Sequence, residues 1–204
     1  MPRYIYPPRP KTTIPPQQLP LEESRGIWLW QHKFNGDRCV AIVDVSASKR
    51  NVTFCNRHGK FHSPLKLQSL TKQFSSANFS LPVGTHYLDG ELIGDSLVLF
   101  DVIQLSNYLI GKNQVERLDI LSKICGNPTE PCGQKIALSI TDNIWMARNG
   151  DRDFLMHYQE YIDSDLIEGL VLRKKDSCLD NWGAKEYEVD WQLRCRKPSK
   201  KYRF

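Results

Sequence analysis

The chain has 204 residues, 40% of them hydrophobic, which predicts one domain with a well-buried core, or at most a domain with a small appendage. Its net charge of +5 is a modest basic excess that suits a polyanionic partner without requiring one. The six cysteines include no C-x-x-C pair and the histidines have no zinc-ligand spacing, which argues against a metal framework and for reduced thiols. No signal peptide or membrane-length apolar segment is present, so we expect no membrane partner and an intracellular protein.

Proline dominates the start of the chain. Residues 1–20 hold seven of the twelve prolines, so we expect an extended arm there that packs across a domain at 21–204. Basic residues gather at both ends of the chain. They are Arg3, Arg9 and Lys11, and then Arg194, Arg196, Lys197, Lys200, Lys201 and Arg203. Each cluster is equally compatible with a solvated end and with phosphate contacts.

From Gly26 onward, runs of β-branched and aromatic residues predict strands. The predicted strands are 27–33, 39–45, 52–55, 85–93, 96–103, 166–174 and 191–196. The first three should form an antiparallel meander, and Gly94-Asp95 should join the fourth and fifth in a hairpin. Apolar spacing predicts helices at 65–74, 113–124 and 152–162, the last behind an Asp151 cap. This mixture predicts an α+β fold.

The segment Lys33-Phe34-Asn35-Gly36-Asp37-Arg38 ends the first predicted strand. A lysine there, in a partly apolar setting beside a permissive glycine, suits a covalent nucleophile, because the amine attacks only in its neutral form. A lone K-x-x-G is far more often a strand that ends in a charged turn. The rest of the sequence decides between these interpretations.

Five further segments follow in order. They are Asn56-Arg57-His58-Gly59, Leu88-Asp89-Gly90-Glu91-Leu92, Leu99-Phe100-Asp101-Val102, Glu168-Gly169-Leu170-Val171-Leu172-Arg173 and Trp191-Gln192-Leu193-Arg194-Cys195-Arg196. With the lysine segment, this series resembles the ordered motifs of the covalent nucleotidyltransferases: DNA ligases, RNA ligases and capping enzymes. The similarity spans about 26–197 and is nearest to the adenylation domain of ATP-dependent DNA ligases. It implies an ATP-grasp-like nucleotidyltransferase domain of antiparallel sheets flanked by helices.

The resemblance implies a role for each motif. Lys33 would be the nucleophile that forms lysyl-AMP from ATP with Mg²⁺. Glu168 would bind the metal, and Glu91 would meet the ribose or a metal-bound water. Phe100 would stack on the base, although an aromatic residue in such a strand is usually core. Asp101 could equally cap a turn.

Three polar side chains would complete the nucleotide and nick contacts. Gln31 lies two residues before Lys33 on the same strand face, and its amide can accept from adenine N6 and donate to N1, which favours adenine over guanine. Arg38 and Arg57 match family arginines that contact ribose or the phosphate of the nicked strand. The Arg57 turn and the glutamate at 168 favour a ligase over a capping enzyme.

The sequence departs from the family pattern in several places. Asn35 stands where most ligases have aspartate. Arg173, Arg194 and Arg196 stand where lysines usually touch phosphate; arginine keeps the charge but cannot relay a proton, so we expect an altered grip on phosphate. Family ligases generally continue into an OB-fold after the last of these motifs, whereas this sequence ends at Phe204, so we expect no OB-fold here. The basic tail, with Lys200 and Lys201, could replace part of that electrostatic clamp.

These observations predict an ATP-dependent DNA ligase domain that seals 5′-phosphate/3′-hydroxyl nicks in duplex nucleic acid, with DNA favoured over RNA. Two alternatives stay open. One is an RNA ligase, since several of those also lack an OB-fold. The other is a nucleotide- or nick-binding module without turnover, against which the intact Lys33, Glu91 and Glu168 argue. It also stays open whether a separate protein supplies an OB-fold or a clamp.

Overall fold

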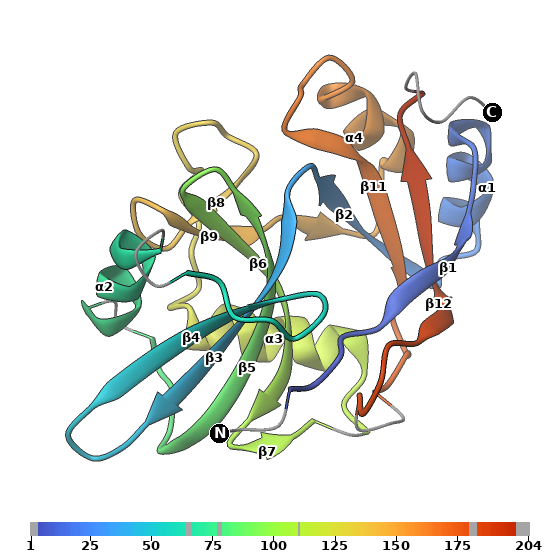
Figure 1. Cartoon of the computed structure of the whole chain (residues 1–204). Coiled ribbons are helices and arrows are strands. Elements are labelled where there is room, and N and C mark those ends of the chain that lie inside the picture. Colours follow the sequence, from blue (N-terminus) through green and yellow to red (C-terminus); the bar gives the residue numbers. More distant parts are fainter. Residues whose placement is uncertain (1–3, 64–66, 77–78, 110, 180–182, 199–204) are drawn as a thin grey trace.

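The computed structural model describes residues 4–63, 67–76, 79–109, 111–179 and 183–198. Two sheets stand next to each other, and helices cover their outer faces (Figure 1). The predicted α+β class is confirmed. The sheets are mainly antiparallel, as expected, but each contains one parallel pairing, β1 with β12 and β6 with β9.

The larger sheet has seven strands in the order β4-β3-β5-β6-β9-β8, with β7 beside β6. Its strands are β3 (Asp37–Val45), β4 (Arg50–Asn56), β5 (Gly84–Ile93), β6 (Ser96–Leu105), β7 (Asn107–Tyr108), β8 (Ala137–Ser139) and β9 (Ile144–Ala147). Helices α2 (Gln68–Ser76) and α3 (Gln114–Ile124) pack on it. Phe74 and Leu121 lie in one core cluster with Val43, Leu88 and Leu99 of the strands, so this apolar layer fixes the helices to the sheet.

The smaller sheet has the order β1-β12-β11-β2-β10. Its strands are β1 (Arg9–Thr13), β2 (Trp28–Phe34), β10 (Asn149–Gly150), β11 (Ile167–Lys174) and β12 (Glu188–Arg196). A 3₁₀ turn (Pro16–Gln18) leads into α1 (Leu19–Ser24), and α1 packs against α4 (Phe154–Glu160). Trp28 and Trp30 share a core cluster with Leu19 and Phe154. Among the described helices, none has the length and apolar character needed to span a bilayer.

Helix α3 begins with a capping box. The Asn113 side chain accepts from the backbone N–H of Glu116, and the Glu116 carboxylate accepts from the backbone N–H of Asn113. Leu118, Leu121 and Ile124 are buried as their spacing predicts. Val115, predicted on the same face, lies in the first turn of the helix and is 47% exposed.

The start of α4 corrects the predicted Asp151 cap. Asp153 occupies the cap position with a left-handed φ of 59° and makes no side-chain cap bond. The Glu23 carboxylate of α1 instead accepts from the backbone N–H groups of Asp153 and Phe154, at 2.8 and 2.9 Å. Asp151 pairs with Lys175. The cap therefore comes from another helix, and local spacing could not predict it.

The predicted three-strand meander is wrong at its first connection. β3 and β4 pair as expected, and β5 and β6 form the predicted hairpin. β2, however, pairs with β11 and β10 in the smaller sheet, so the chain crosses between sheets after Phe34. At this crossing, a Cβ on Gly36 would lie 2.0 Å from the backbone oxygen of Leu92, which only glycine avoids. Lys33 therefore lies near the end of β2, just before the chain passes from the smaller sheet to the larger one.

The proline-rich segment joins the smaller sheet. Arg9–Thr13 forms β1, which pairs with β12 in parallel, and Ile5, Ile14 and Leu19 are buried. The segment is thus extended in part and lies across the domain. The division into an arm at 1–20 and a domain at 21–204 stays a prediction.

Candidate active site

A cavity of about 580 Å³ lies between the two sheets. Its lining includes all ten of the predicted site residues that the structure describes. These are Gln31, Lys33, Arg38, Arg57, Glu91, Phe100, Glu168, Arg173, Arg194 and Arg196. Lys200 and Lys201 lie outside the described residues. Side chains predicted from segments far apart in the sequence therefore meet in one pocket.

The amine of Lys33 points at a carboxylate across the β2–β11 ladder. Its Nζ lies 2.6 Å from Oε2 of Glu168, and Nε of Arg196 on β12 lies 3.4 Å from the same oxygen. The register pairs Gly169 with Lys33, which places Glu168 beside the end of β2. Gly169 has a φ of +140°, and a Cβ there would lie 2.0 Å from the backbone oxygen of Cys195. The side chains of Lys33 and Glu168 are 19% and 31% exposed, so a solute can reach both.

Glu91 is a second carboxylate in this pocket. Burial raises its pKa to about 7, an effect that the positive charges of Arg38 and Lys33 partly offset and that the negative charge of Glu168 increases. The carboxyl is therefore only half ionised near neutral pH. A cation beside it would favour its charged form.

This raised pKa gives a stability prediction with a definite sign. The folded carboxyl binds a proton up to about pH 7 and the unfolded one only up to about 4.5, so stability falls as pH rises between these values. Glu91→Gln removes this loss. We expect it to leave the free energy of unfolding nearly unchanged at pH 4.5 and to raise it by up to about 3 kcal/mol at pH 8. Urea unfolding at the two pH values measures this.

Glu130→Gln is the matched control, because Glu130 is exposed and lies outside the pocket. It should shift the free energy of unfolding equally at both pH values. An equal shift for Glu91→Gln as well would contradict a raised pKa at position 91.

Two guanidinium groups border the ring of Phe100. Arg38 Cζ lies 5.0 Å and Arg173 Cζ 5.1 Å from the ring centroid. Arg38 is held by both oxygens of the buried Asp89. Phe100 itself is only 8% exposed. A base that stacks on this ring would have to share it with these arginines, so the predicted stacking role of Phe100 stays a prediction.

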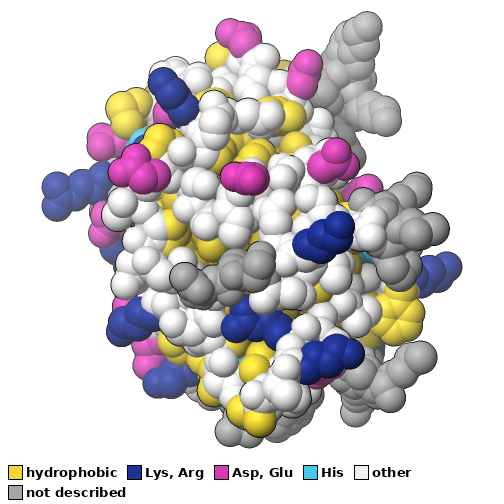
Figure 2. Space-filling model, turned by 90° about the vertical axis from the view of Figure 1, so that its left-hand side faces the viewer, with side chains coloured by type: hydrophobic (Ala, Val, Ile, Leu, Met, Phe, Trp, Pro, Cys, Tyr) yellow, Lys and Arg dark blue, Asp and Glu magenta, His cyan; other side chains and the backbone are white. Residues whose placement is uncertain are grey.

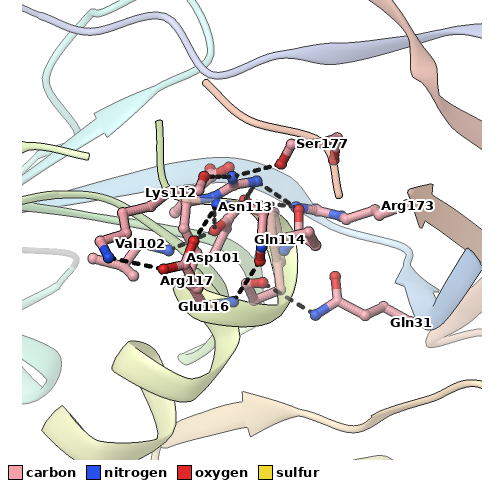
Figure 3. Close-up of polar contacts among 12 residues, drawn as sticks. Gln31, Asp101, Val102, Lys112, Asn113, Gln114, Glu116, Arg117, Arg173 and Ser177 are labelled. Atoms are coloured by element: carbon pink, nitrogen blue, oxygen red, sulfur yellow. Dashed lines mark hydrogen bonds and ion pairs between the residues drawn. The ribbon is translucent and has the colours of Figure 1, made fainter. Parts of the chain in front are cut away.

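Arg173 belongs to a buried network behind the pocket (Figure 3). Its Nη1 lies 2.9 Å from Oδ2 of Asp101, while Nε of Arg117 lies 3.1 Å from Oδ1 of the same carboxylate. Arg117 also donates to Gln114 and to the backbone oxygens of Lys112 and Ser177. Asp101 is on β6, Arg117 on α3 and Arg173 on β11, so one carboxylate ties both sheets and a helix together. Sequence analysis missed Arg117, because it lies within a predicted helix and belongs to none of the motifs.

The Gln31 amide lies in the pocket wall, with the residue 2% exposed. Its Nε2 donates to the backbone oxygen of Phe100 at 3.1 Å, and its buried Oε1 has no hydrogen-bond partner among the described residues. A buried acceptor without a donor is costly unless a ligand supplies one. Oε1 of Gln31 is the atom that the sequence analysis predicts to accept from adenine N6.

The pocket rim carries a chain of polar contacts that the sequence only partly indicated. Arg57 donates to His58, whose Nδ1 lies 2.9 Å from Glu186, and Arg9 reaches the other oxygen of Glu186 at 2.9 Å. The turn that presents Arg57 is closed by the Asn56 side chain, which accepts from two backbone N–H groups. Sequence analysis noted Arg9 only as one member of a basic cluster at the N-terminus. It did not predict Arg9 at the pocket, because it predicted no strand in a segment so rich in proline.

Positive charge gathers at the pocket. Six arginines and one lysine line it, against four carboxylates. On the face at the left of Figure 1, shown in Figure 2, most acidic side chains lie in the upper half of the view and most basic ones in the lower half. The pocket is therefore suited to a polyphosphate ligand.

Two sheets in this arrangement, with a lysine at the end of β2 that faces a carboxylate on β11, form the α+β fold of ligase nucleotidyltransferase domains. The ligase domain of LigD from M. tuberculosis has this fold, with a TM-score of 0.61 at 14% identity over 93% of this chain and 59% of that chain. Pmar-Lig gives 0.58 at 15% identity over 94% and 46%. A Lig E DNA ligase gives 0.52 at 13% identity over 95% and 70%.

The predicted resemblance to ligase adenylation domains is thus confirmed at the level of the fold. No protein-family model and no curated protein matches the chain. The chain spans 59% of the LigD ligase domain and less than half of Pmar-Lig.

Proposed function

We propose that this chain is the catalytic domain of an ATP-dependent polynucleotide ligase. Nζ of Lys33 attacks the α-phosphate of ATP, a phosphoramidate bond forms, and pyrophosphate leaves. The AMP then passes to a 5′-phosphate end, which frees Lys33. A 3′-hydroxyl attacks that phosphate, the phosphodiester forms, and AMP leaves. The observation that carries the proposal is the contact between Lys33 and Glu168 in a pocket lined by arginines.

The pocket suits the Mg²⁺ that this chemistry needs. Glu168 is close enough to Glu91 for its negative charge to raise the pKa of Glu91. Two carboxylates fit a hard cation that takes its other ligands from phosphate and water. When bound, Mg²⁺ neutralises charge on the phosphates during transfer. Glu168 and Glu91 would hold it.

The amine must lose a proton and leave its ion pair before it can attack. Lys33 is ion-paired with Glu168, and a protonated amine has no lone pair. Arg196 is a second cationic partner of Glu168. The negative charge of Glu168 therefore stays paired with a positive charge when Lys33 turns to the phosphate. Arg194 and Arg196 line the pocket and would bind phosphate oxygens, whereas Arg173 is bound to Asp101.

Gln31 supports the choice of ATP. Its free Oε1 can accept from the N6 amino group of adenine, but not from the O6 of guanine, which has no hydrogen to donate. Its Nε2 is already committed in part to Phe100. The selectivity for adenine over guanine would therefore rest mainly on Oε1 of Gln31.

The substrate we favour is a nick in DNA, with Arg57 on the nicked-strand phosphate. Arg57 is exposed at the pocket rim. The test is sealing of matched nicked duplexes, all-DNA and all-RNA, with ATP and Mg²⁺. We expect faster sealing of DNA. Faster sealing of RNA would favour the RNA-ligase alternative, and binding of a nick without any sealing or AMP transfer would favour the binding-module alternative.

Arg57→Ala checks the role of the rim. Loss of one phosphate contact should weaken nick binding and reduce the salt slope of the binding constant by about 1. AMP transfer to the protein should stay unchanged, because Arg57 is exposed at the rim of the pocket and contacts His58. Titrations at two salt concentrations measure the slope, and an unchanged slope would remove Arg57 from the nucleic-acid interface.

A further inference from the structure

A cluster of side chains that could bind a metal ion lies on the other face of β2. Residues alternate along the strand, so Gln31 and Lys33 face the pocket while the ring of His32 lies with Trp30 and Phe34. There it meets His157 and Glu160 of α4, and one ligand atom from each of the three lies within 4.8 Å of the others. The proposed ligase function uses none of these three side chains.

His32 is the unusual member of this cluster. It is 3% exposed, and neither ring nitrogen has a hydrogen-bond partner of good geometry among the described residues, although the backbone of His157 is near enough to influence the ring. Burial lowers the pKa of His32 to about 4, so the ring is neutral and keeps a lone pair at neutral pH. Buried polar groups are nearly always satisfied, and this ring carries two nitrogens that are not.

Aromatic packing holds both imidazole rings in place. Tyr161 meets the His32 ring edge to face at 4.9 Å, and the Tyr161 hydroxyl donates to the backbone oxygen of Lys135. Trp30 stacks on the His157 ring at 3.9 Å. Rings fixed in this way lose little further freedom when they take a ligand.

The carboxylate is already oriented toward the histidines. Nδ1 of His157 lies 3.1 Å from Oε2 of Glu160, while Arg148 lies 3.6 Å from the other oxygen, Oε1. Outer contacts of this kind orient the carboxylate ligands of metal sites. The Glu160 side chain is 36% exposed and that of His157 is 14% exposed, so the cluster opens to solvent on the side of α4.

We propose that His32, His157 and Glu160 bind a divalent transition-metal ion, zinc by preference, with water in the fourth position. Two imidazoles and one carboxylate suit zinc and not Mg²⁺, which prefers oxygen ligands. Ligand atoms around tetrahedral zinc lie roughly 3.3 Å apart, so the separations of up to 4.8 Å require only small side-chain rotations. The ion would fasten α4 to the strand that carries Lys33.

The sequence contains only a weak signal for this site. His157 and Glu160 are three residues apart, a spacing that places both on one helix face. The third ligand comes from β2, distant in the sequence, so no local zinc-ligand pattern exists. The expectation that the histidines form no metal framework rested on local spacing alone.

The alternative is a structural role, in which His157 and Glu160 form a surface ion pair and His32 packs as an aromatic core residue. The two roles differ in their response to zinc. Zinc titration of the whole chain against a chromogenic zinc indicator, with Mg²⁺ present in excess and reducing agent that does not bind metal, measures both stoichiometry and affinity.

We expect one zinc per chain that Mg²⁺ does not displace. Glu160→Gln changes an exposed position and His157→Gln a partly buried one on α4, so both variants should keep the fold, yet each should weaken zinc binding at least about tenfold. His58→Gln and Cys178→Ser are matched controls outside the cluster and should bind zinc as the wild type does. Stoichiometric binding that survives the His157 and Glu160 substitutions, or a wild type that binds no zinc, would overturn the site.

His32→Phe separates the two roles of the buried ring. Phenylalanine keeps the aromatic packing and removes two unsatisfied nitrogens, so the unfolding midpoint without zinc should stay equal or rise. Zinc should raise the unfolding midpoint of the wild type, and this rise should disappear in the variant. A variant that is as strongly stabilised by zinc as the wild type would contradict the assignment.

Discussion

Replacement of Lys33 by alanine is expected to abolish transfer of AMP to the protein. Lys33 is the only lysine that lines the pocket among the residues that the structure describes, so no neighbouring amine can replace it. Removing a nucleophile typically lowers turnover by roughly 10⁴-fold or more. Single-turnover incubation with labelled ATP and Mg²⁺, followed by denaturation, measures the covalent product.

The loss should be chemical and not structural. Glu168 keeps Arg196 as a cationic partner in Lys33→Ala, and the lost ion pair is partly exposed, so the free energy of unfolding should change by less than about 1 kcal/mol. Lys175→Ala is the matched control, because Lys175 pairs with Asp151 outside the pocket. It should form the adduct at the wild-type rate. Adduct formation by Lys33→Ala at that rate would reject Lys33 as the nucleophile.

Asp101→Ala should cause the largest loss of stability. Among the residues that the structure describes, its carboxylate is the only one that forms an ion pair with Arg117 and with Arg173, which are 0% and 5% exposed. Removing one partner of a buried ion pair costs about 3–5 kcal/mol, because it leaves uncompensated charge in the core. Here two cations would lose that partner. Urea unfolding of the variant measures the loss.

Asp119→Ala is the comparison, since Asp119 pairs with Lys123 in an exposed i,i+4 contact on the same helix as Arg117. It should cost at most about 0.5 kcal/mol. A cost for Asp101→Ala as small as this would mean that the buried network adds nothing to the fold. We also expect Asp101→Ala to weaken ATP binding, because Arg173 would no longer be held beside Phe100.

Much of the fold follows from local patterns. The hairpin of β5 and β6 was predictable from two apolar runs around Gly94, and α3 from the spacing of Leu118, Leu121 and Ile124. The assembly of Lys33 with Glu168 was not a property of any one segment. It was inferred from the order of six short motifs, and the structure brings the motifs together in one pocket.

The features that local patterns missed all depend on distant partners. β2 and β3 are consecutive in sequence but belong to different sheets, because β2 finds its neighbours in β10 and β11. β8, β9 and β10 are too short for a periodic signal. The cap of α4 comes from Glu23, and the ring of His32 meets α4 only in the folded chain. Each depends on tertiary contacts, which spacing along the chain does not encode.

The most direct test of the ligase proposal is the intact mass of the wild-type protein after incubation with ATP and Mg²⁺. The proposal predicts a gain of one AMP per chain, carried by Lys33 and reversed by added pyrophosphate, with no such gain in Lys33→Ala. GTP should give a lower yield if Gln31 selects adenine. A folded wild-type protein that gains no nucleotide mass from either ATP or GTP would contradict the account.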